Sequence, residues 1–192
     1  YLDTPDFRLI RRSLEKPVYK EKLRLRSYGR TERDSPVFME LKKKYRSIVY
    51  KRRLTLPYDR ALDCLTGACP WPETQIGGEI RYTVDFYPDL ESRVFLAYER
   101  DSWLAPESGL RITFDDAIRF RTEELTLDSD PWGTALLGPD QVLMELKAPG
   151  AIPLWMVRLL TEMRLYKTSF SKYGTAYQLL LEREWKGGKR YA

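Results

Sequence analysis

Apolar and polar residues alternate along several segments of the chain with the two-residue period of a β-strand. In residues 18–28, VYKEKLRLRSY, Leu23 and Leu25 fall on one face and basic residues fall on the other. The same period predicts further strands over residues 37–44, 47–56, 93–103, 109–115, 117–121 and 141–147. A turn near Tyr45 and Arg46 joins two of these strands into a hairpin.

Apolar residues at helical spacing predict the remaining elements. Residues 153–166, PLWMVRLLTEMRLY, have the pattern of an amphipathic helix. Helices are also expected over residues 5–15, 58–68 and 171–184, and over residues 76–87, where the pattern is ambiguous but favours a helix. The order of these elements shows no βαβ rhythm, no linker and no internal repeat. The pattern therefore predicts one α+β domain over residues 1–192 with mostly antiparallel strands.

Charged side chains share one face of most predicted strands, and apolar side chains occupy the other face. On residues 18–28 the charged face carries Lys20, Lys22, Arg24 and Arg26. The charged faces of the later strands carry Glu40 and Lys42, then Lys51 and Arg53, then Tyr98, Arg100 and Ser102, then Arg111, Thr113 and Asp115, and finally Glu145 and Lys147. A barrel closed from these strands would place all of these side chains in its lumen.

These charged faces have two interpretations. A solvated outer face of an antiparallel sheet shows the same alternation, and for any single strand this is the simpler interpretation. Lys22, Arg24 and Arg26, however, follow one another on the strand about 6.7 Å apart. At an effective dielectric constant near 20, neighbouring like charges at this distance repel by roughly 2.5 kcal/mol, before screening by water and salt. A bound polyanion therefore explains the arrangement better than an empty surface does.

The composition limits the chemistry that these residues can perform. The chain has 192 residues, with 33 Lys and Arg, 28 Asp and Glu, and no His. The absence of His excludes Ser-His-Asp and Cys-His catalysis and any His-bound zinc. A bound metal would need carboxylate ligands, which favours Mg²⁺ or Mn²⁺. Glu40 and Glu145 are the candidate ligands, although each could equally well balance the charge of Lys42 or Lys147.

Further features bear on where the chain works. Cys64 and Cys69 are too few for a disulfide scaffold, so they indicate thiols in a reduced compartment. No apolar run has the length of a membrane span and no signal peptide is visible, so a cytoplasmic or cytosol-facing domain is expected. The first residue is Tyr rather than Met, so we expect a fragment of a longer chain.

Nucleic acid is the main alternative ligand for a basic surface. Glu residues on the basic face would repel a phosphodiester backbone unless a metal intervened. The sequence also has no helix-turn-helix, zinc-finger or RRM signature. We therefore expect no nucleic-acid partner.

Several short strings, in the same order along the chain, resemble the VTC domain, a family named after the vacuolar transporter chaperone complex. They are YLDTPD at 1–6, YKEKLRLRSYG at 19–29, VFMELKKKY at 37–45, YERDSW at 98–103, LRITFD at 110–115, LMELK at 143–147 and SFSKYGTAY at 169–177. The family belongs to the triphosphate tunnel metalloenzymes of the CYTH-like superfamily. The resemblance thus implies an antiparallel β-barrel with flanking helices and a basic tunnel. Family members carry a further strand upstream of the YLDTPD string, so we expect this chain to lack its N-terminal strand.

The resemblance also implies roles for individual residues. Arg24 and Arg26 match the family's phosphate-binding pair. The implied catalytic residues are Arg24, Arg26, Lys42, Arg100 and Arg111. The implied phosphate-binding residues are Lys22, Lys51, Arg53, Lys147, Ser171 and Lys172. Glu145 matches the family's metal ligand, and Glu40 is the second candidate ligand for Mn²⁺ or Mg²⁺.

By this resemblance the chain is expected to be a polyphosphate polymerase, a metal-dependent transferase that moves the γ-phosphoryl group of ATP to a growing polyphosphate chain and releases ADP. The terminal phosphate of the acceptor would be the nucleophile, so the protein needs no base. Two alternatives stay open. One is a triphosphatase of the same superfamily, in which water attacks; the other is a non-catalytic module that binds polyphosphate or nucleotide. The sequence gives no oligomeric state.

Overall fold

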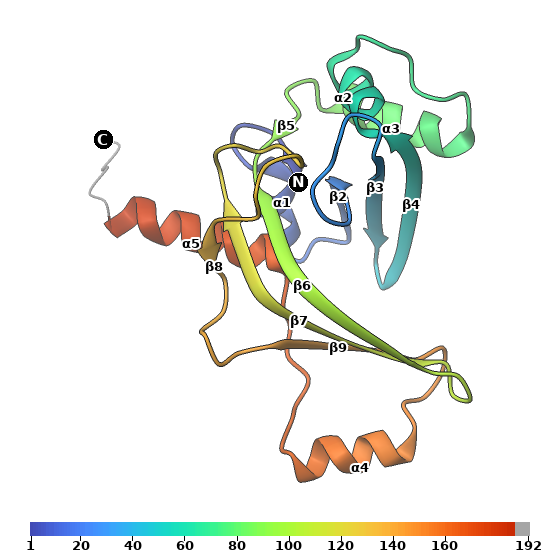
Figure 1. The fold of residues 1–192 in the computed structure, drawn as a ribbon, viewed down its shortest axis with the longest axis vertical. Coiled ribbons are helices and arrows are strands. Elements are labelled where there is room, and N and C mark those ends of the chain that lie inside the picture. Colours follow the sequence, from blue (N-terminus) through green and yellow to red (C-terminus); the bar gives the residue numbers. More distant parts are fainter. Residues whose placement is uncertain (187–192) are drawn as a thin grey trace.

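Antiparallel β-sheets and surrounding helices make up residues 1–186, the part of the chain that the computed structural model describes, with side chains as far as Arg183 (Figure 1). The strands are β1 (Leu2–Asp3), β2 (Tyr19–Arg26), β3 (Pro36–Tyr45), β4 (Ile48–Pro57), β5 (Glu91–Ser92), β6 (Phe95–Ala105), β7 (Leu110–Arg121), β8 (Thr134–Ala135) and β9 (Leu143–Lys147). The helices are α1 (Arg8–Leu14), α2 (Tyr58–Thr66), α3 (Gln75–Phe86), α4 (Leu154–Glu162) and α5 (Lys172–Lys186).

The strands pair into two sheets within residues 1–186. The first has the order β4-β3-β2-β1-β5; in the second, β6, β7 and β8 are neighbours and β9 also pairs with β7. Every pair is antiparallel. The chain passes from β5 of the first sheet to β6 of the second through Arg93 and Val94. The α+β class is confirmed, but the pairings among these residues do not join into the closed barrel that was expected.

Helices cover the apolar face of the first sheet, opposite its charged face. Leu23, Met39 and Leu41 are fully buried and pack with Leu2 of β1 and Ile80 of α3. A second cluster joins α2 to the same sheet and consists of Val37, Leu56, Tyr58, Ala61 and Cys64. The helix expected over the ambiguous segment 76–87 is therefore confirmed, and α3 buries Gly77, Ile80 and Thr83.

The predicted strands over 109–115 and 117–121 are one strand, β7, which is interrupted by a bulge. Ala117 has a positive φ of 44° and the register with β6 shifts between Ala97 and Glu99. One extra residue in β7 changes which side chains share a face. Asp115 lies opposite Arg100, and beyond the bulge Phe120 lies opposite Leu96 on the same face. The bulge thus lets one face of β7 be charged at one end and apolar at the other.

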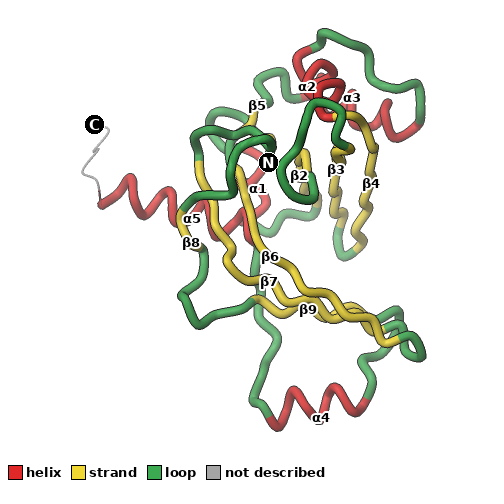
Figure 2. Tube along the Cα trace, viewed as in Figure 1, coloured by secondary structure: helices red, strands yellow, loops and turns green. Residues whose placement is uncertain are grey.

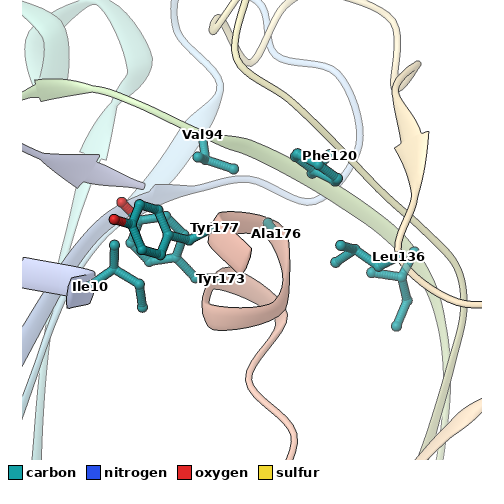
Figure 3. Close-up of a cluster of buried hydrophobic side chains, with 8 residues drawn as sticks. Ile10, Val94, Phe120, Leu136, Tyr173, Ala176 and Tyr177 are labelled. Carbon is teal, nitrogen blue, oxygen red and sulfur yellow. The ribbon is translucent and has the colours of Figure 1, made fainter. Parts of the chain in front are cut away.

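Helix α5 packs on the apolar end of β7. Tyr173, Ala176 and Tyr177 of α5 form one buried cluster with Ile10 of α1, with Val94 and with Ile118, Phe120 and Leu136 (Figure 3). The cluster fills the space between α1 and the second sheet. It fixes the first residues of α5, which include Lys172, relative to the charged end of β7.

Asp3 connects three of these elements. Its side chain is fully buried; Oδ1 accepts hydrogen bonds from the backbone N–H groups of Thr4 (2.9 Å) and Leu9 (2.8 Å), and Oδ2 accepts from Ile10 N–H (3.0 Å) and the Tyr173 hydroxyl (2.8 Å). Phe7, which precedes α1, makes no side-chain cap. Asp3 therefore satisfies donors at the start of α1 that would otherwise lack a partner.

Helix α4 differs from the prediction and lies apart from both sheets (Figure 2). It ends at Glu162 instead of residue 166, because Arg164 adopts the left-handed conformation with φ 53°. Of the helices in residues 1–186, none combines the length and the apolar character that crossing a membrane requires.

Replacing Asp3 by Ala should lower the free energy of unfolding by about 3 kcal/mol, because buried backbone N–H groups lose their only acceptor. Tyr173→Phe removes one hydrogen bond to the same carboxylate and should cost about 1 kcal/mol. Urea unfolding of both variants measures these values. Asp34→Ala, at an exposed position, is the control, and an Asp3→Ala protein as stable as this control would contradict the role of Asp3.

Candidate functional site

The charged face of the first sheet contains two rows of side chains that cross three strands. Register places Lys22, Lys42 and Lys51 directly opposite one another on β2, β3 and β4. The neighbouring row consists of Arg24, Glu40 and Arg53. Like charges opposite each other in a sheet destabilise it, so the lysine row needs a source of compensation.

Glu40 supplies part of this compensation. Its side chain is only 2% exposed, and its two oxygens accept from Arg24 (Nε 2.9 Å, Nη2 2.6 Å), Arg53 (Nε 2.8 Å, Nη2 2.6 Å) and Lys51 (Nζ 2.9 Å). Burial alone would raise the pKa of Glu40, but the hydrogen bonds from Lys51, Arg24 and Arg53 outweigh it and lower the pKa to about 2. Glu40 is therefore a carboxylate that holds three cations in place.

Lys22 and Lys42 have no carboxylate partner within the described residues. Burial, followed by the charges of Lys20 and Lys42, lowers the pKa of Lys22 to about 8, and its Nζ donates to Ser171 Oγ at 3.0 Å. Burial and then the charge of Lys147 lower the pKa of Lys42. A bound anion would relieve the repulsion at both lysines.

A second buried carboxylate organises the charged face of the second sheet. Asp115 is fully buried and accepts from Arg100 (Nε 2.5 Å, Nη2 2.6 Å) and from Lys172 Nζ. Hydrogen bonds from Arg100 and Lys172 lower the pKa of Asp115 against the opposing effect of burial. The Tyr98 ring lies 5.1 Å from the Arg100 guanidinium carbon and 4.5 Å from Lys172 Nζ. Asp115 and Tyr98 thus hold these two cations as Glu40 holds its three.

Glu145, Lys147 and Arg111 lie further along the same face. Thr113 lies opposite Glu145, and Arg111 lies opposite Lys147. Glu145 is 44% exposed and accepts from Lys147 at 3.1 Å, with Arg100 at 4.0 Å. Arg111 makes no ion pair within the described residues and is exposed. Glu145 is therefore the accessible carboxylate of the site, and Arg111 is one of its uncompensated cations.

The charged faces of the two sheets come together. Lys42 of β3 is close enough to Lys147 and Glu145 of β9 for both charges to affect its pKa. Lys22 of β2 reaches Ser171, next to Lys172, whose ammonium group binds Asp115 of β7. Side chains predicted from separate strands thus form one site between the two sheets.

The whole site has many more cations than carboxylates. Its ten cations are Lys22, Arg24, Arg26, Lys42, Lys51, Arg53, Arg100, Arg111, Lys147 and Lys172, against the three carboxylates of Glu40, Asp115 and Glu145. Arg26 is at the end of β2, where its guanidinium carbon lies 4.6 Å from the Tyr28 ring. A surplus of this size in one place favours a multiply charged anion as ligand.

A cavity of about 280 Å³ adjoins the site at the ends of β2 and β6. Arg24, Arg26, Tyr98 and Lys172 border it on the charged side. The rest of its lining is mostly apolar and comes from the segment after β2, from the start of β6, from α2 and from residues 125–131. The cavity therefore extends from the charged side chains into a mostly apolar space at the ends of β2 and β6.

Two residues to which the sequence pattern assigns no role also belong to the site. Asp115 binds Arg100 and Lys172, and the Tyr1 hydroxyl accepts from Arg24 Nη1 at 2.9 Å. Alternation could have identified Asp115 as a counter-ion, since it shares its face with Arg111. No local pattern indicates that Tyr1 reaches Arg24, because that contact depends on the pairing of β1 with β2.

The carboxylates of the site do not form a metal cage. No cluster of three or more acidic or thiol ligands occurs in the part of the chain that the structure describes. Both oxygens of Glu40 are occupied by cations, whereas Glu145 is accessible. Mg²⁺ and Mn²⁺ are commonly held by one or two carboxylates together with substrate phosphates. The donor set thus fits a cation that arrives with phosphates at Glu145 better than a cation held at Glu40.

The fold and the site define an α+β protein in which two antiparallel sheets bring a surplus of cations together around two buried carboxylates. Residues 1–181 match the VTC domain family, so the chain belongs to this family. The resemblance noted in the short strings is thereby confirmed over nearly the whole chain. No curated protein matches the chain.

The low pKa of Glu40 predicts how stability depends on pH. Its folded-state pKa, about 2, lies below the ordinary value of 4.5, so its ion pairs stabilise the fold above pH 4.5 and this contribution is lost as the pH falls towards 2. The loss is at most about 3 kcal/mol. Urea unfolding between pH 7 and pH 2 should show a shallower pH dependence for Glu40→Gln than for the unchanged protein. Parallel curves would show that Glu40 is not paired as described.

Proposed function

We propose that this chain is the catalytic domain of a polyphosphate polymerase, which transfers the γ-phosphoryl group of ATP to a growing polyphosphate chain and releases ADP. The observation that carries the proposal is the surplus of cations between the two sheets, several of which have no carboxylate partner in the part of the chain that the structure describes. Membership of the VTC domain family supports a function related to polyphosphate. The chain has no His, and the site has no evident protein nucleophile.

Two groups of cations would bind phosphates in different ways. One group is oriented by Glu40 or Asp115 and would present fixed donors to phosphate oxygens: Arg24, Lys51, Arg53, Arg100 and Lys172. Lys22, Lys42 and Arg111 have no carboxylate partner within the described residues and would gain most from a bound anion. Arg26, Lys147 and Ser171 would extend the contacts along a longer polyphosphate.

Phosphoryl transfer needs positioning and charge neutralisation more than covalent chemistry by the protein. The cations would align the terminal phosphate of the acceptor with the γ-phosphate of ATP, and they would neutralise charge on both. An oxygen of the acceptor phosphate attacks, the bond from the γ-phosphorus to the bridging oxygen breaks, and ADP leaves with that oxygen. The attacking oxygen is already ionised, so no side chain has to remove a proton.

A divalent cation belongs to the proposal as a companion of the phosphates. Glu145 would hold Mn²⁺ or Mg²⁺ through its accessible carboxylate, and Glu40 could contribute only by releasing one of its cations. When bound, such an ion withdraws charge from the phosphate oxygens that it contacts. Everything else in the mechanism depends on the Lys and Arg side chains.

Replacing Arg111 by Ala should lower turnover about 100-fold, because an uncompensated cation that contacts the transferred group is lost. The fold should persist, since Arg111 is exposed and makes no ion pair within residues 1–186. The assay incubates the full-length protein with ATP and Mn²⁺ and resolves the products on a gel, where a polymerase gives a ladder of long polyphosphate. The matched control is Arg33→Ala, an exposed arginine outside the site.

The same assay separates the alternatives. Release of free phosphate without a ladder would favour a triphosphatase, in which water replaces the acceptor phosphate. Tight binding of polyphosphate with neither product would favour a non-catalytic module. Unchanged turnover in Arg111→Ala, with Arg33→Ala equally active, would contradict the assignment of the site.

A further inference from the structure

The two cysteines of the chain are in direct contact at the end of α2. Cys64 Sγ and Cys69 Sγ lie 2.9 Å apart, closer than two non-bonded sulfur atoms normally approach, and both are free thiols. Neither residue belongs to the phosphate site or lines the cavity. The sequence alone indicated only two separate thiols, so this contact comes from the fold.

The backbone between the cysteines is arranged to bring them together. Gly67 closes α2 with a left-handed conformation (φ 79°), which reverses the direction of the chain. The Asp63 carbonyl oxygen then accepts from the N–H groups of Ala68 at 2.8 Å and Cys69 at 3.3 Å. These bonds hold Cys69 beside the last turn of the helix, so the two sulfur atoms meet without any other segment having to move.

We propose that Cys64 and Cys69 form a reversible intramolecular disulfide, which makes this turn a thiol-oxidation site. Cys69 is partly exposed, whereas Cys64 is buried in the cluster that joins α2 to the first sheet. Cys69 is therefore the thiol that a small-molecule disulfide such as oxidised glutathione reaches first. Burial, followed by the contact with Cys69, raises the pKa of Cys64 to about 11, so Cys64 is a poor first nucleophile.

The reaction is an exchange in two steps. The Cys69 thiolate attacks one sulfur of oxidised glutathione, and one glutathione leaves as thiolate and takes up a proton. Cys64 then loses its proton to solvent and attacks Cys69 Sγ, and the second glutathione leaves and is protonated. Two protein thiols are oxidised to one disulfide, and one glutathione disulfide is reduced to two thiols.

Closure would fix the chain just before Pro70, Trp71 and Pro72. Trp71 packs against both clusters on the apolar face of the first sheet. A disulfide at Cys69 would restrict the segment that carries Trp71 and would hold it on this face. Oxidation is therefore expected to raise the melting temperature by about 5 °C, the modest gain of a short loop.

The test equilibrates the full-length protein with buffers of reduced and oxidised glutathione, quenches with N-ethylmaleimide and measures intact mass. The expected product has lost two hydrogen masses, carries no maleimide at Cys64 or Cys69 in a peptide map, and returns to the dithiol with excess reduced glutathione. Cys64→Ala should instead keep a glutathione adduct on Cys69, and neither it nor Cys69→Ser should show the oxidation-dependent rise in melting temperature.

Three outcomes would overturn the proposal. In the first, both cysteines of the unchanged protein are still alkylated after oxidation. In the second, a stable glutathione adduct remains on Cys69 although Cys64 is present. In the third, the oxidised product is a disulfide-linked dimer on non-reducing gels. Because no phosphate ligand takes part, none of these results bears on the phosphate site.

Discussion

Repulsion between like charges is the constraint on which the rest of this structure depends. Lysines lie directly opposite one another across β2, β3 and β4, and the second sheet adds further cations from β6, β7 and β9. Glu40 and Asp115 make this arrangement possible. Each is almost completely buried, each accepts from more than one cation, and each is held in the ionised state by those partners. A buried carboxylate with several cationic donors stabilises charge that a single exposed ion pair could not.

The two buried carboxylates lie on parts of the sheets that the apolar clusters do not occupy. In the first sheet the apolar face is covered by α2 and α3, which leaves the opposite face to the charges. In the second sheet one face carries both the charged site and part of the apolar core. The bulge at Ala117 puts Ile118 and Phe120 on the same face as Asp115, and α5 packs against them. Since α5 begins at Lys172, the apolar packing of this helix also positions a cation beside Asp115. Core and site are thus built from the same strand.

Alternation in the sequence predicts the long strands and the charged face of each, because the side-chain period of a strand depends only on local backbone geometry. It does not predict the partners of each charge. Glu40 could be interpreted either as a metal ligand or as the neighbour of Lys42, and only the register with Arg24 and Arg53 shows where its oxygens bind. The two-residue strand β1 is too short to have a period, and the bulge in β7 made one strand look like two. The contact between Cys64 and Cys69 depends on the turn at Gly67, whose geometry the sequence does not fix.

Some cations of the site are paired with Glu40 or Asp115 and others are not, and this difference bears on ligand binding. Arg24 and Arg100 are already oriented by charge-assisted hydrogen bonds, so a phosphate bound there would meet donors whose positions need no reorganisation. Lys22 and Lys42 carry the remaining repulsion; burial first, and then the charges of neighbouring lysines, lower the pKa of both. An anion between the sheets would therefore act on the second group most strongly. It would raise the pKa of both lysines and supply the counter-charge that they lack among the described residues. Because further carboxylates in those places would compete with a phosphate, the incomplete compensation is what leaves room for a polyanion.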